Sequence, residues 1–368
     1  MTTNVVYLIG SGASSGALRF RGESNGLSMY DVREYIFDLL KEAQESEYKW
    51  VRNEIGDSTD IERLITIFEE SGTQRYSEGA QELRALFRKG IENRLRLEDE
   101  KSDGHFVPEL LVYLLDMHNV SNLNEKIKGI LTTNYEDLVE RAMQEVYGGI
   151  DYQFLANYGS SKFKFKTDVP PVLKLHGSFN WKNEYPISIM STPQNRDEPI
   201  WIPPGVVKSK QMYPFNMVWG KAREVLDCDV LRIIGSSLSQ NDWDLISLLA
   251  STQNYRTDEK GPYAIEFIGS SETMKKIREE HEYVKMKWLS ELDEIKYYLS
   301  TNEGSGKAEE MNNETAAGIL KKMESLGNFN LFSYWLRAKG EYLNIKKGLF
   351  LGEASKFKSF IERGLGGG

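Results

Sequence analysis

The sequence predicts an α/β protein built on a doubly wound, Rossmann-like parallel sheet, with a helical insertion and a C-terminal helical region. Short apolar segments rich in β-branched residues alternate with amphipathic segments of helical period along most of the chain. Strands that alternate with helices indicate βαβ units, and βαβ units form a parallel sheet. A chain of 368 residues, 40% of them apolar, is long enough to bury such a core without disulfides.

The first predicted strand, residues 4–9, runs into a glycine-rich turn from Gly10 to Gly16. The segment from about 25 to 123 then shows helical spacing, as at Ile61, Leu64 and Phe68, and no alternating strand pattern. It is therefore predicted to be a helical insertion after the first strand. Further strands are expected at 127–131, 172–175, 229–234, 263–268 and 284–288, and helices at 135–147, from 242, at 272–281 and from 289.

These segments suggest two regions joined by a linker. Residues 1–300 are expected to form the nucleotide-binding catalytic domain, including the insertion. Residues 301–314 are rich in Gly, Ser, Asn, Glu and Lys, a composition typical of linkers. Residues 315–368 are expected to form a C-terminal helical region.

Charge and cysteine content exclude several classes of protein. A net charge of −9 disfavours broad contact with nucleic acid or with an anionic membrane. The single cysteine, Cys228, permits neither an internal disulfide nor a Cys-x-x-Cys zinc site, and we expect it to pack as a small hydrophobe. The sequence shows neither a secretory signal pattern nor an apolar run of membrane-spanning length, so a cytoplasmic location is expected.

Four stretches that follow predicted strands carry the candidate chemistry. They are Gly10–Gly16, Gly129–Asp137, Leu173–Trp181 and Gly235–Asp242. In open parallel sheets, ligands bind beyond the carboxyl ends of the strands, near the point where strand order reverses. Each stretch also has a purely structural interpretation. The first could be a plain tight turn, and Asn134 in the second could cap a helix. His176 in the third could be a structural hydrogen-bonding residue, and Asn241 or Asp242 in the fourth could cap a helix.

The order and spacing of the four stretches are more specific than any one of them. The series Gly-Ser-Gly-Ala-Ser…Phe-Arg-Gly, Thr-Thr-Asn-Tyr-Glu, Leu-His-Gly-Ser and Gly-Ser-Ser-Leu resembles the sirtuin motif series. It is most similar to the zinc-less, sirtuin-like NAD⁺ hydrolases of bacterial antiphage defence systems, over about residues 4–290. The chain lacks the four zinc-binding cysteines of sirtuins, and Thr133 and Glu136 replace the usual Gln and Asp. These departures weigh against protein deacylation more than against NAD⁺ binding.

The resemblance implies NAD⁺ as the substrate, no metal, and specific roles for eleven residues. Asn134 would orient the nicotinamide ribose and the attacking water, and His176 would act as general base. The pyrophosphate would be held by Gly10, Gly12 and Ser14. Phe20, supported by Arg21, would cover the nicotinamide ribose. The adenosine half would face Gly235, Ser236 and Ser237, and Asp242 is a further candidate for contact with a ribose.

The expected function is therefore hydrolysis of NAD⁺ to nicotinamide and ADP-ribose by an effector of abortive infection. The sequence shows no sensor domain, so control is expected from homo-oligomerisation or from a partner, one class being the HerA-type DNA-translocating ATPases. Two alternatives remain open: an NAD⁺-dependent protein deacylase, and a nucleotide-sensing module without turnover.

Overall fold

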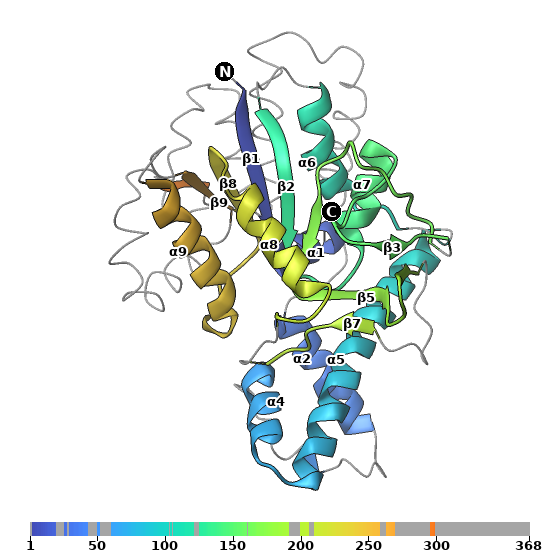
Figure 1. Cartoon of the computed structure of the whole chain (residues 1–368). Coiled ribbons are helices and arrows are strands. Elements are labelled where there is room, and N and C mark those ends of the chain that lie inside the picture. Colours follow the sequence, from blue (N-terminus) through green and yellow to red (C-terminus); the bar gives the residue numbers. More distant parts are fainter. Residues whose placement is uncertain are drawn as a thin grey trace, which may run out of the picture.

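The computed structural model describes residues 2–19, 26–27, 29–42, 50–51, 60–102, 104, 106–120, 125–159, 161–190, 199–205, 210–257, 263–268 and 295–298. Two sheets organise this part of the chain (Figure 1). The larger sheet has six strands in the order β10-β9-β8-β1-β2-β4, and every pair is parallel. Its strands are β1 (Thr3–Ile9), β2 (Glu125–Thr132), β4 (Val172–Lys174), β8 (Val230–Ile234), β9 (Ala264–Ile268) and β10 (Ile295–Tyr298).

The strand order confirms the predicted doubly wound sheet. From β1 the chain steps outward to β2 and β4, then returns to the other side of β1 and continues through β8, β9 and β10. Strand order thus reverses between β1 and β8, and the crevice beyond their carboxyl ends is where such sheets bind ligands. The residues of β1 from Val5 to Ile9 are almost completely buried, as expected for a central parallel strand.

Helices cover the sheet and extend from one end of it. Between β1 and β2 lie α1 (Ser11–Arg19), α2 (Met29–Glu42), α4 (Ile61–Glu70), α5 (Gln74–Lys101) and α6 (Glu109–Val120). Figure 1 shows α2, α4 and α5 together beyond the carboxyl end of β1 and β2. The remaining helices are α7 (Leu138–Tyr147), α8 (Phe215–Val225), the 3₁₀ helix η1 (Gln240–Asp242) and α9 (Trp243–Thr257).

The apolar spacing recognised in the sequence explains how α4 packs. Ile61, Leu64, Ile65 and Phe68 are its buried residues, and Asp60 caps its first turn by accepting a hydrogen bond from the amide of Arg63. Phe68 packs beside Trp50 and Tyr76. The insertion therefore has its own apolar layer.

A second, four-stranded sheet was not predicted. Its order is β3-β6-β5-β7, with β3 (Ala156–Asn157), β5 (Gly177–Lys182), β6 (Ile187–Ile189) and β7 (Pro199–Trp201). These strands are too short and too irregular to give an alternating pattern. An aromatic group of Tyr152, Phe154 and Trp181 fills its interior, with edge-to-face contacts at 5.1 and 4.8 Å between ring centroids.

Three local predictions need correction. The segment after β1 is no open glycine-rich turn, because α1 begins at Ser11 and includes Gly12 and Ser14. The helix expected from Tyr135 begins only at Leu138. The helix expected from Leu289 is wrong at residues 295–298, which form β10, because β-branched and aromatic residues there pair with β9.

Some of the other predictions can be compared with the structure, and some fall outside the residues that it describes. Cys228 is buried and forms no disulfide, as expected of a small hydrophobe. The predicted helix 272–281, the strand 284–288 and the regions 301–314 and 315–368 lie outside the described residues. Among the described helices, none combines the length and apolar character needed to cross a membrane.

Candidate functional site

The candidate site lies at the carboxyl edge of the six-stranded sheet, where four strand ends meet. Ser14 follows β1, Asn134 follows β2, His176 follows β4 and Gly235 follows β8. These positions are far apart in sequence, and parallel pairing of the strands brings them to one edge. Asn134 and His176 are both buried, at 5% and 3% exposure.

The ends of β1 and β8 are packed backbone against backbone. The amide of Gly10 donates to the carbonyl of Ile234 at 2.9 Å, and the amide of Gly12 donates to that of Gly235 at 2.8 Å. Gly235 has φ +62°, and a Cβ there would lie 2.1 Å from the amide nitrogen of Ala13. Close packing and the positive φ therefore require glycine at position 235. The amides of Gly10 and Gly12 already donate hydrogen bonds within the protein.

Asn134 is held by a buried hydrogen-bond network. Its Nδ2 donates to Ser14 Oγ at 2.9 Å and to Glu136 Oε1 at 3.1 Å, and Ser14 Oγ donates to the same Glu136 oxygen. The amide of Asn134 donates to Thr132 Oγ1, whose hydroxyl donates to the carbonyl of Ile9. The side chain of Asn134 is therefore fixed between α1 and the β2–α7 connection.

This arrangement decides against a capping role for Asn134. The N-cap of α7 is Asp137, and it makes no side-chain cap bond. With both hydrogens of Asn134 Nδ2 engaged, Oδ1 is the atom left to accept a hydrogen bond, and no donor among the described residues reaches it. The network orients one acceptor of fixed position.

Glu136 is a fully buried carboxyl group next to this amide. Burial raises its pKa, and the charge of Glu140 adds to that effect, while Lys174 and the hydroxyl of Ser14 oppose it. The net direction is upward because removal of the carboxylate from water is the largest contribution. The next residue, Asp137, differs: burial also disfavours its charge, but the cations of Arg141 and Lys162 outweigh it and lower its pKa.

His176 lies at the end of β4 beside a carboxylate. Its Nε2 is 3.6 Å from Asp242 Oδ1, too long for a direct hydrogen bond but close enough for charge attraction when the imidazole is protonated. Its carbonyl accepts a hydrogen bond from the amide of Ile202 at 2.8 Å. The histidine is therefore anchored through its backbone and faces Asp242 with its ring.

Aromatic rings border the histidine. The ring of Tyr135 lies 6.2 Å from that of His176, stacks on Phe179 at 5.3 Å and meets Trp201 edge-on at 5.2 Å. Phe87 of α5 contacts both Tyr135 and Trp201. Burial, and then the charges of Glu62 and Asp242, raise the pKa of Tyr135, whose neutral hydroxyl donates to the carbonyl of Ile202. The insertion and the second sheet thus meet at the site.

The insertion also reaches the loop that carries Asp242. Asn241 Nδ2 donates to Asp60 Oδ2 at 3.1 Å and to Glu62 Oε2 at 2.8 Å. Asp60 and Glu62 stand at the start of α4. Asn241 and Asp242 belong to η1, whose N-cap is Ser239, with its hydroxyl accepting from the amide of Asn241.

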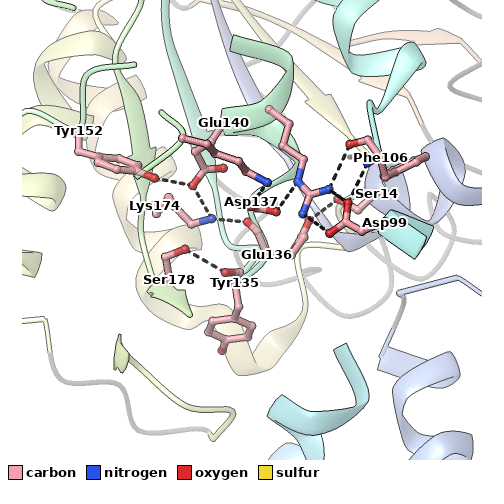
Figure 2. Close-up of polar contacts among 12 residues, drawn as sticks. Ser14, Asp99, Phe106, Tyr135, Glu136, Asp137, Glu140, Tyr152, Lys174 and Ser178 are labelled. Atoms are coloured by element: carbon pink, nitrogen blue, oxygen red, sulfur yellow. Dashed lines mark hydrogen bonds and ion pairs between the residues drawn. The ribbon is translucent and has the colours of Figure 1, made fainter. Parts of the chain in front are cut away.

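A second polar layer lies behind Glu136 (Figure 2). Lys174 and Glu140 form an ion pair of 2.9 Å in which both side chains are completely buried. Lys174 Nζ also donates to the carbonyl of Glu136, and the hydroxyl of Tyr152 donates to Glu140 Oε1 at 2.9 Å. This layer joins β4, α7 and the main chain of the β2–α7 connection.

The beginning of α7 is also tied to the insertion. Arg141 pairs with Asp137 at 2.8 Å, and its guanidinium spans both carboxylate oxygens of Asp99 at 2.5 and 3.0 Å. Arg141 additionally donates to the carbonyl of Phe106. These contacts fix α7 against the end of α5 (Figure 2).

The structure brings most of the predicted site residues to this edge: Gly10, Gly12, Ser14, Asn134, His176, Gly235 and Asp242. Ser236 Oγ accepts the amide of Leu238, and the side chain of Ser237 is exposed. Phe20 and Arg21 lie outside the described residues. The binding roles assigned to these residues remain predictions.

Sequence reasoning missed four residues that build the site. Glu136 enters the sequence analysis only as a replacement for the usual Asp, and Lys174, Glu140 and Trp201 are given no role of their own. A signal existed for two of them: Lys174 interrupts the apolar strand Val172–Leu175, and Glu140 stands next to the apolar residues of α7. A charge at a position of predicted burial is unfavourable unless it is paired.

The fold and the site define a doubly wound α/β protein with a buried Asn–Ser–Glu network and a histidine at the carboxyl edge of the parallel sheet. Residues 128–287, which include Asn134, His176 and Asp242, match the SIR2-like domain family. This match covers less than half of the chain. No group of three or more metal-binding side chains occurs among the described residues.

Comparisons with whole proteins add little detail. No curated protein matches the chain. Among the solved structures that match is one described as "Sir2 homologue S24A mutant-ADP ribose complex". It is 12% identical, with a TM-score of 0.34, over 78% of this chain and 95% of that chain.

Proposed function

We propose that this chain binds NAD⁺ at the carboxyl edge of its six-stranded sheet and hydrolyses the bond between nicotinamide and ribose. Water attacks C1′ of the ribose, the C1′–N bond breaks, and neutral nicotinamide leaves with the electron pair of that bond. The products are nicotinamide, ADP-ribose and a proton. The observation that carries the proposal is the buried network of Ser14, Asn134 and Glu136 at the carboxyl edge of the sheet, with His176 at the end of β4 on the same edge, in a chain with a SIR2-like match.

Asn134 is proposed to position the ribose and the attacking water. Because Nδ2 is held by Ser14 and Glu136, its Oδ1 is directed as a fixed acceptor for a water or a ribose hydroxyl. A group held in place before binding loses little further entropy when the reaction proceeds. The buried carboxyl of Glu136 also places partial negative charge near a substrate whose nicotinamide ring is cationic.

His176 is proposed to take the proton from the attacking water or from a ribose hydroxyl. Imidazole suits this role because its ordinary pKa lies near neutral pH. The carboxylate of Asp242, 3.6 Å from Nε2, stabilises the imidazolium that forms. The ring of Tyr135, itself packed against Trp201, excludes water from one side of the histidine.

The dinucleotide is proposed to lie across the β1–β8 crevice. The first turn of α1 begins directly after β1, so its positive dipole end faces this crevice and favours a pyrophosphate. Since the amides of Gly10 and Gly12 donate to β8, other groups of this turn would hold the phosphate oxygens.

In the cell, we propose that NAD⁺ depletion by this chain arrests or kills an infected bacterium, as the resemblance to the antiphage family implies. An NAD⁺ hydrolase of this kind must be inactive until it is triggered. Control by self-association or by a partner of the HerA-type ATPase class is therefore part of the proposal. Light scattering tests it: a mass near the 42.2 kDa of one chain, at micromolar concentration, would count against self-association.

The test of the activity is product analysis of pure protein incubated with NAD⁺, with and without an acetylated peptide. Release of nicotinamide and ADP-ribose without peptide supports the proposal. Release that depends on the peptide indicates a deacylase. Binding without products, both alone and with the added partner, indicates a sensing module. Either outcome overturns the proposal. A parallel reaction with added HerA-type partner reveals activity that depends on assembly.

A further inference from the structure

The ion pair between Lys174 and Glu140 lies behind the candidate site and has no part in the chemistry proposed above. Both side chains and that of Tyr152 are completely buried. Removing two charges from water is costly, and well-packed apolar residues usually serve stability as well or better. The pair therefore calls for an explanation other than stability.

The contacts of Lys174 indicate what it does. It stands on β4 two residues before His176, and its Nζ crosses to the β2–α7 connection, where it donates to the carbonyl of Glu136. The side chain of Glu136 in turn accepts from Asn134 Nδ2. Figure 2 shows Lys174 between Glu140 and Glu136, with Ser14 on the far side of Glu136.

Glu140 and Tyr152 hold the ammonium group in place. The carboxylate of Glu140 accepts from Lys174 at 2.9 Å and from the Tyr152 hydroxyl at 2.9 Å. A lysine without this carboxylate would be an unpaired buried charge, which is unfavourable. The ion pair is thus what allows a charged donor to reach the main chain at Glu136.

We infer that Lys174 is a positioning residue, which fixes the connection carrying Asn134 to the strand carrying His176. It acts through the carbonyl of Glu136 and touches neither substrate nor reacting atoms. The expected effect of Lys174 on catalysis rests on the proposed function. Its expected effect on how firmly the backbone of residues 133–137 is held does not.

The test compares three proteins: the unsubstituted chain, Lys174→Met, and the double variant Lys174→Met with Glu140→Gln. The single variant leaves a buried carboxylate unpaired and is expected to be strongly destabilised. The double variant removes both charges and keeps an acceptor for Tyr152, so it should fold. A matched control is Arg232→Met with Glu125→Gln, which removes a buried pair at 2.8 Å near the amino end of β2.

Hydrogen–deuterium exchange of residues 133–137 is the first readout. The double variant should exchange about tenfold faster there, as loss of one charge-assisted hydrogen bond predicts. The Arg232/Glu125 control should leave these amides unchanged. Unaltered exchange at 133–137 in the folded double variant overturns the inference, whether or not the chain cleaves NAD⁺.

Steady-state kinetics is the second readout. In the double variant, kcat for nicotinamide release should fall by about 10- to 100-fold, as expected for slight misplacement of a reacting group, with KM nearly unchanged. A purely structural pair predicts full kcat once the double variant is folded, and that result also overturns the inference. Absence of nicotinamide release from the unsubstituted chain, with and without the added partner, refutes the proposed function, and the exchange experiment then decides on Lys174 alone.

Discussion

The imidazole Nε2 of His176 lies 3.6 Å from Oδ1 of Asp242, a residue that follows β8 and reaches the histidine at the end of β4. On sequence grounds Asp242 is a candidate for contact with a ribose. The structure places its carboxylate beside the proposed general base. The two roles predict different kinetics, and the first experiment distinguishes them.

Replacing Asp242 by Asn should lower kcat about tenfold, which corresponds to the loss of ~1.4 kcal/mol of charge stabilisation of the imidazolium. KM should change little if the carboxylate acts on His176. A ribose contact made in the bound state would instead raise KM and leave kcat intact. Michaelis profiles of nicotinamide release separate these outcomes.

Replacing His176 by Ala should reduce NAD⁺ cleavage by about 10²–10⁴-fold, the usual cost of losing a general base. Thermal unfolding and oligomer mass should stay as in the unsubstituted protein. His281→Ala is the control, because His281 lies outside the motif series. Near-normal cleavage by the His176 variant would show that the histidine is only a structural residue.

Replacing Glu136 by Gln should increase stability at neutral pH while keeping the acceptor for Asn134 and Ser14. Burial raises the pKa of Glu136 above its ordinary 4.5. Because this pKa is raised, the carboxyl group of Glu136 makes its full favourable contribution to the free energy of unfolding below pH 4.5. That contribution is lost as pH rises through the pKa of the folded state. The stability advantage of the variant should therefore be absent near about pH 4 and grow toward about pH 7.

Urea denaturation at a series of pH values measures this difference. Asp137→Asn is the contrasting control, because the pKa of Asp137 is lowered by Arg141 and Lys162. Its carboxylate stabilises the fold above the ordinary pKa, so that variant should be less stable at neutral pH and equal only in acid. A Glu136→Gln variant that loses stability at neutral pH would contradict a raised pKa of Glu136.

Replacing Gly235 by Ala should damage both fold and activity. A Cβ would lie 2.1 Å from the amide nitrogen of Ala13, and φ is +62°. Gly148 provides the matched control, since it has φ +72° with nothing within 4 Å of an added Cβ. Gly148→Ala should cost only ~1–2 kcal/mol for the left-handed backbone. Gly235→Ala should cost clearly more in chemical denaturation; equal losses would mean that the β1–β8 turns can move apart.

Chelation should leave the protein unchanged. We expect no stoichiometric zinc, because the sequence has one cysteine and no clustered histidines. Treatment with EDTA should alter neither the unfolding midpoint nor nicotinamide release, and elemental analysis measures bound metal directly. One zinc ion per chain would refute this expectation.

The sequence was sufficient for five of the six strands of the larger sheet and for the expectation that the candidate residues share one of its edges. The strands at 127–131, 172–175 and 229–234 are mainly apolar because parallel strands are buried on both faces, so they stand out without any tertiary information. Chemistry-bearing residues directly after these strands could be assigned to one edge, because parallel strands place their carboxyl ends together.

Only the tertiary structure decided which of those residues touch. The second sheet escaped prediction because its strands are two to six residues long, too short to establish a period. Residues 295–298 became a strand through pairing with β9, a long-range contact that local pattern does not contain. The partners of Asn134, His176 and Lys174 lie 120, 66 and 34 positions away, at Ser14, Asp242 and Glu140. The sequence determines the residue types, but the packing of α1, α7 and η1 on the sheet determines which side chains come within bonding distance.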